Sequence, residues 1–132
     1  MGNKIRTFQE RKPEETAVEY LLQQDEATDI LLWTNYNNGG YAEFMGIKCY
    51  IDPRAEVFLK ENNQQKDIFH EYVSLEKGKL YYKEFIDRYH FTYYLTEDND
   101  ILYTYLANDP DYQIVYEDEN PKSKIRIFIK LI

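Results

Sequence analysis

The sequence is poor in the residues that build disulfides, metal sites and membrane spans. Its 132 residues include one cysteine, Cys49, and two histidines. A single cysteine excludes an internal disulfide and a multi-cysteine zinc site. No apolar run approaches the ~20 residues that cross a bilayer, and the first residues lack the apolar stretch of a signal peptide. We therefore expect that the chain as given neither spans a membrane nor is exported by itself, and we expect no metal.

Positive charge is also scarce, with 16 Lys and Arg against 24 Asp and Glu and a net charge of −8. Such a surface repels a phosphate backbone, so nucleic acid is not expected as a partner. No serine occupies a nucleophile elbow, Cys49 falls in an apolar strand where a buried thiol is the usual state, and His70 and His90 are far apart in the sequence. No catalytic triad and no cofactor are predicted.

Tyrosine is abundant, with 14 copies in a chain that is 17% aromatic. A tyrosine ring supplies a large apolar area while its hydroxyl needs water or a hydrogen-bond partner. This suits half-buried sheets and carbohydrate-facing surfaces. We favour ordinary packing over ligand stacking for most of these rings.

Apolar periodicity divides the chain into alternating helices and strands. Helices are expected from Pro13 onward and around 68–73, 82–89 and 101–106. Strands are expected at 30–33, 48–51, 91–95, 112–116 and 124–131, the last two as an antiparallel hairpin. The fold class is thus α/β, a small layered sandwich with a mainly parallel sheet of about five strands and helices on both faces. Residues 13–132 form one domain, and 1–12 a linker.

Ligands of open α/β sheets bind beyond the carboxyl ends of the strands, which draws attention to the loops 35–41, 52–56 and 96–100. In the first loop, amides and a glycine pair suit a close approach of backbone to ligand. The candidate ligand residues there are Asn35, Asn38, Gly39, Gly40 and Tyr41. The loop lacks the spacing of a phosphate-binding motif, and we favour the alternative that both glycines supply positive φ in a tight connection.

The second loop adds Asp52, Arg54 and Glu56 as candidates. Asp52 and Arg54 lie two apart at a strand end, so their side chains leave the same face if strand geometry persists past Pro53. Arg54 could hold a carboxylate or phosphate while Asp52 accepts a sugar hydroxyl; equally, the pair could tie the loop down. The aspartates of the third loop, Asp98 and Asp100, fall in turns and caps where a solvated structural role is normal.

Several short motifs occur in an order that is similar to one bacterial family. They are Pro13 with Ala17, Val18, Tyr20 and Leu21; 35–41; Asp52-Pro53-Arg54; Arg88-Tyr89-His90-Phe91 with Tyr94-Leu95; and 111–118. Together they resemble the extracytoplasmic C-terminal domain of multi-spanning membrane proteins of the glycosyltransferase-C, or protein-mannosyltransferase-like, class. Ala42-Glu43-Phe44 departs from the apolar loop of many relatives.

The resemblance implies a domain outside the bacterial cell membrane, attached to a membrane-embedded portion of its parent protein, with 1–12 membrane-proximal. It implies a link to cell-envelope glycan or lipid-linked sugar transfer, in which this domain binds or positions rather than catalyses. The alternatives are a freestanding small transferase or hydrolase that uses Asp52 with a second carboxylate such as Glu56 or Asp98, and a protein-interaction module that packs through exposed tyrosines.

Overall fold

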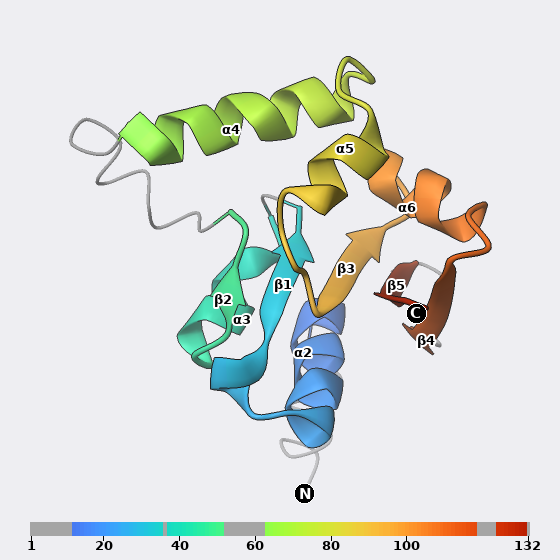
Figure 1. Cartoon of the computed structure of the whole chain (residues 1–132). Helices are drawn as coiled ribbons and strands as arrows, with labels where there is room; N and C mark the ends of the chain where they lie inside the picture. The colour runs from blue at the N-terminus through green and yellow to red at the C-terminus, as the bar shows by residue number, and fades with distance from the viewer. Residues whose placement is uncertain (1–11, 36, 52–62, 119–123, 132) are drawn as a thin grey trace, which may run out of the picture.

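The computed structural model describes residues 12–35, 37–51, 63–118 and 124–131, with the backbone alone at 63–67. Within them, one sheet has the strand order β2-β1-β3-β5-β4 (Figure 1). Strand β1 is parallel to β2 and to β3, whereas β5 is antiparallel to β3 and β4. The predicted α/β fold with a C-terminal antiparallel hairpin is confirmed. The strands are β1 (Leu31–Thr34), β2 (Lys48–Cys49), β3 (Tyr93–Glu97), β4 (Tyr112–Glu117) and β5 (Ile125–Lys130).

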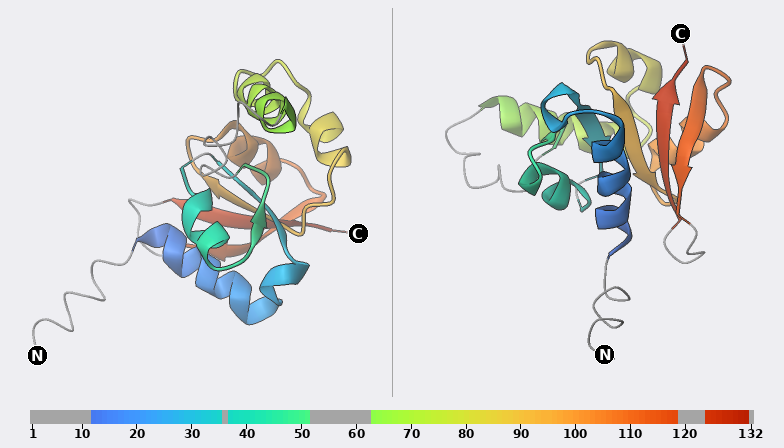
Figure 2. Two further views of the ribbon diagram at one scale, coloured as in Figure 1. Left: turned by 90° about the vertical axis from the view of Figure 1, so that its left-hand side faces the viewer. Right: turned by 90° about the horizontal axis from the view of Figure 1, so that it is seen from below.

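One face of the sheet is covered by α2 (Pro13–Gln24) and α3 (Gly39–Phe44) (Figure 2). The fixed φ of proline suits the first turn of a helix, where Pro13 lies in α2. Two acidic residues in the same turn interact favourably with the positive end of the helix dipole. The apolar spacing then buries one stripe against the sheet, as the sequence predicts. Helix residues in this core are Ala17, Val18, Leu21 and Ala42. The 3-10 turn η1 (Ala27–Asp29) leads from α2 into β1.

The other face is covered by α4 (Asn63–Glu76), α5 (Tyr82–Asp87) and α6 (Ile101–Ala107) (Figure 2). This second core is rich in aromatic side chains. Trp33 and Tyr94 contribute from adjacent strands and pack under apolar residues of all three helices. Those helix residues are Leu75, Phe85, Ile86, Leu102 and Leu106. Because both faces are covered, the strands bury side chains in both directions, which explains their continuous apolar runs.

Three local expectations are wrong in detail. Strand β2 is two residues long rather than four, and β3 starts at Tyr93 rather than at Phe91. Gly39 and Gly40 begin α3 and have no positive φ; among the described glycines, Gly46 and Gly78 have it. The hairpin also contains a bulge that the sequence did not indicate, where the register shifts between Ile114 and Tyr116.

Candidate functional site

The connections that follow β1 and β3 leave the sheet on opposite faces. After β1 the chain enters α3, which packs with α2, whereas after β3 it enters α6 on the aromatic side. Because β1 and β3 are adjacent and parallel, their carboxyl ends form the topological switch point of the sheet. Switch points of open α/β sheets are the usual place for a ligand. The residues that gather there are Asn35, Asn38, Glu76, Glu97 and Asp100, named here the switch-point cluster.

Asn35 connects the end of β1 to the end of β3. Its side-chain oxygen accepts hydrogen bonds from the backbone N–H groups of Asn37 at 3.1 Å and Asn38 at 2.9 Å, which closes the turn before α3. Its Nδ2 group donates to Glu97 Oε1 at 2.9 Å and to the two Asp100 oxygens at 3.2 and 3.1 Å. Asn38 Nδ2 donates to the same Glu97 oxygen at 2.5 Å. The two predicted asparagines are therefore held together against two carboxylates.

Asp100 is buried at the start of α6, with 5% of its surface exposed. Its Oδ2 accepts the backbone N–H of Glu97 at 2.8 Å, so the side chain bonds backward into the β3 turn. Burial raises the pKa of this carboxyl to about 7, although the hydrogen bonds from Glu97 N–H and from Asn35 lower it. Glu76 and Glu97 add a smaller upward push. Asp100 thus exchanges a proton near neutral pH.

Glu76, at the end of α4, brings a third carboxyl group. Its Oε2 accepts the N–H of Ile101 at 3.5 Å, while its Oε1 is buried without a hydrogen-bond partner among the described residues. Burial raises the pKa of this carboxyl. Burial also raises the pKa of Tyr72, with further contributions from Glu76, Asp100 and Glu97. These mutual effects place the end of α4 beside the cluster.

Among the described residues, the predicted ligand residues Gly39, Gly40 and Tyr41 are not part of the switch-point cluster. Gly39 is buried and Gly40 exposed at the start of α3. The Tyr41 hydroxyl lies 3.5 Å from Glu19 Oε2 of α2, and its ring lies 6.4 Å from that of Phe44. The predictions for Asp52, Arg54 and Glu56 lie outside the described residues. Their roles, and those of the glycines and Tyr41, stay predictions.

Sequence reasoning missed Glu76, Glu97 and Asp100 as members of the cluster. The loop 96–100 was recognised as a strand-end loop, but its aspartates were expected to be solvated. Asp98 is exposed, as expected, whereas Asp100 is not. The available signal was the position of Asp100 directly before the apolar run 101–106, which is that of a helix N-cap at the end of a strand. Glu76 had no comparable signal.

Several buried or half-buried tyrosine hydroxyls donate hydrogen bonds to carboxylates. Glu71 of α4 accepts from Tyr50 and from Tyr89, each at 2.6 Å, and also from Arg88. Tyr82 donates to Asp109 at 2.7 Å. Burial and then the Glu71 hydrogen bond raise the pKa of Tyr89 to about 12. Packing, which the sequence favoured, accounts for these rings.

Cys49 is buried, as predicted, and both histidines have exposed side chains. A hollow of about 440 Å³ between α4 and α5 contains Arg88, whose charge Glu71 already neutralises. In the part of the chain that the structure describes, no three His, Cys, Asp or Glu side chains converge as metal ligands, and no helix combines the length and apolar character of a membrane span.

Comparisons of the chain with models of protein families, with curated proteins and with solved structures found no match.

Proposed function

We propose that the chain is an accessory domain of a bacterial multi-spanning membrane protein, placed on the extracytoplasmic face, that binds or positions a glycan or lipid-linked sugar. The order of sequence motifs that resembles the glycosyltransferase-C class supports this assignment. Its expected partner is the membrane-embedded portion of the same protein.

The observation that carries the binding site is the gathering of amides and carboxyl groups at the switch point. Asn38 Nδ2 and Asn35 Nδ2 converge on Glu97 Oε1, and the buried Glu76 Oε1 has no described partner. Sugar hydroxyls both donate and accept, so they complement a cluster that presents both kinds of group. A ligand hydroxyl could donate there to Glu97, which is half-buried, whereas Glu76 Oε1 is buried. We propose that these side chains bind the hydroxyl groups along one edge of a sugar ring.

One observation favours a second candidate, a small hydrolase or transferase. A carboxyl group with a pKa of about 7 can act as a general acid at neutral pH, and Asp100 has that property close to Glu97. In this alternative Asp100 would protonate a leaving-group oxygen. The alternative requires turnover, which the binding role does not.

Titration calorimetry with soluble oligosaccharides and short-chain polyprenyl-phosphate sugars tests the proposal. We expect binding that Asn38→Ala weakens by about tenfold, since one hydrogen bond to a charged group is worth about that factor. Glu84→Ala, at an exposed site on α5, is the matched control. Binding by neither ligand class would contradict the proposal. Product formation that Asp100→Asn abolishes would replace it with the enzymatic alternative.

A further inference from the structure

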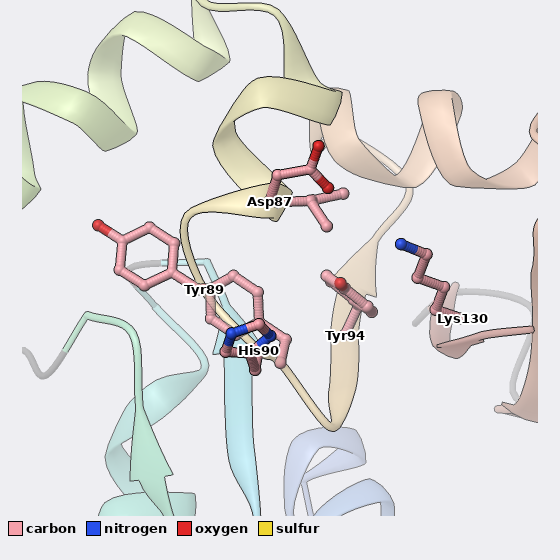
Figure 3. Close-up of a pocket in the computed structure, with 7 residues that line it drawn as sticks. Asp87, Tyr89, His90, Tyr94 and Lys130 are labelled. Carbon is pink, nitrogen blue, oxygen red and sulfur yellow. The ribbon is translucent and has the colours of Figure 1, made fainter. Parts of the chain in front are cut away.

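A hollow of about 250 Å³ lies at the amino end of β3, away from the switch-point cluster. Its walls come from the end of α5, the segment that joins α5 to β3, and the end of β5 (Figure 3). We call it the aromatic hollow. It is lined by Ile86, Asp87, Tyr89, His90, Phe91, Tyr94 and Lys130. A second hollow of about 200 Å³ shares Asp87 and Lys130 and adds Lys83, Asp111 and Tyr112.

The aromatic wall is fixed in place before any ligand arrives. The rings of Tyr89 and Phe91 lie 5.2 Å apart, and Phe91 meets Tyr94 at 5.4 Å and 62°. Tyr94 in turn meets Tyr112 edge-on at 5.7 Å, and the Tyr89 hydroxyl is held by Glu71. Tyr94 has 1% of its surface exposed, so a ligand would pack on the half-buried Tyr89 and Phe91, and it would order few side chains on binding, which removes a common cost of association.

Unlike charges stand on either side of this wall. Figure 3 shows Asp87 above and Lys130 beside Tyr94, with the Lys130 ammonium turned into the space between them. The described ion pairs do not include one between Asp87 and Lys130. A carboxylate acceptor and an ammonium donor thus line one concave space without pairing with each other, and the Lys130 ammonium also interacts electrostatically with Asp109.

The balance of charge selects the ligand class. The two hollows contain Lys83 and Lys130 against Asp87 and Asp111, and Asp109 next to them pairs with Lys83 at 3.8 Å and interacts electrostatically with Lys130. A phosphate would meet two carboxylates, and an amine would meet two ammonium groups, so a ligand with one charge gains little. A sugar ring offers hydroxyls that donate to a carboxylate and accept from an ammonium, and its C–H face can cover an aromatic ring. We infer that the aromatic hollow binds a single neutral sugar ring.

This inference is independent of the proposed function, because it uses different residues at the other end of β3. Tyr94 and Glu97 are three residues apart, about 10 Å along the strand. A sugar in the aromatic hollow therefore does not need the asparagines at the switch point. If both sites bind, they bind two separate sugar units.

The test is a nitrogen-15 NMR titration of the 132-residue chain with glucose, mannose, galactose and N-acetylglucosamine at millimolar concentrations. At least one sugar should shift the amides of 86–94 and of Lys130. Lys130→Ala and Asp87→Ala should each weaken that binding by about tenfold. Their side chains are exposed, so the folded spectrum should survive. Lys77→Ala, an exposed lysine just after α4, is the matched control and should bind as the wild type does.

Three outcomes would overturn the inference: no shift with any sugar, shifts that both hollow variants leave unchanged, and stronger binding of inorganic phosphate or glycine betaine at the same amides. Asn38→Ala separates the two proposals. If Asn38→Ala weakens sugar binding and Lys130→Ala does not, the inference is wrong and the proposed function stands. If Lys130→Ala weakens sugar binding and Asn38→Ala does not, the inference stands and the proposed site at the switch point is wrong.

Discussion

The carboxyl group of Asp100 lies where β1, β3 and α6 meet, and its protonation is coupled to folding. Its pKa is about 7 in the folded chain against an ordinary value of 3.8. A raised carboxyl pKa means that the folded state binds more protons than the unfolded state between those two values. The contribution of Asp100 to stability is therefore greatest below pH 3.8 and is lost as the pH rises toward 7.

We predict that the free energy of unfolding, measured by urea at pH 5, 6, 7 and 8, falls with pH more steeply in the wild type than in Asp100→Asn. One proton contributes at most about 1.4 kcal/mol per pH unit. Asp98→Asn, at an exposed position in the same turn, is the control. A wild-type curve parallel to that of Asp100→Asn would show that Asp100 does not retain its proton in the folded state.

The residues of the candidate site were predictable only in part. An asparagine at the end of an apolar strand indicates a turn, and that turn places Asn35 and Asn38 at the switch point. The partners of these asparagines are about 60 residues away in the sequence. Pairing across that separation depends on β3 aligning with β1, which local patterns do not encode. Gly39 and Gly40 were misread because packing of Ala42 against α2 favours a helix over the turn that glycines suggest.

Helix α4 is attached to the rest of the molecule by the apolar contacts of Ile68, Tyr72 and Leu75 and by hydrogen bonds to Glu71. This side chain accepts hydrogen bonds from Tyr50, which follows β2, and from Arg88 and Tyr89, which follow α5. The Glu71 side chain is 14% exposed. One carboxylate thus joins three segments, and its position in a helix of mostly polar residues gives no indication of this role.

Glu71→Ala should cost roughly 2 to 4 kcal/mol in the free energy of unfolding, because two phenols and a guanidinium lose a common acceptor. Chemical denaturation followed by circular dichroism measures this cost. Glu84→Ala, on the exposed side of α5, should change stability by less than about 0.5 kcal/mol. A loss below about 1 kcal/mol for Glu71→Ala would mean that α4 is held mainly by its apolar contacts.

The sequence predicts the five strands and four of the helices in their order because the periods of its apolar residues are distinct, but it misses η1 and α3. It does not predict that β5 inserts between β3 and β4, since a hairpin alone fits either order. The position of β5 matters for the whole molecule. Ile127 faces the core under α2, while Phe128 faces the aromatic core under α6. The sheet therefore connects two cores that share no helix.

If the two cores form one cooperative unit, a cavity on one face should destabilise the other. Leu21 is fully buried under α2, and Trp33 is fully buried on the opposite face. Leu21→Ala should cost roughly 2 to 5 kcal/mol, and it should lower the urea midpoint of Trp33 fluorescence as much as that of helical circular dichroism. Leu131→Ala, at a site with 43% exposure, is the control and should leave both midpoints nearly unchanged. A Trp33 transition that stays in place while the circular dichroism transition moves would show two separately unfolding layers. In that case residues 13–132 would not behave as the single domain that the sequence predicts, and binding at the switch point, which lies between the layers, would depend on both remaining folded.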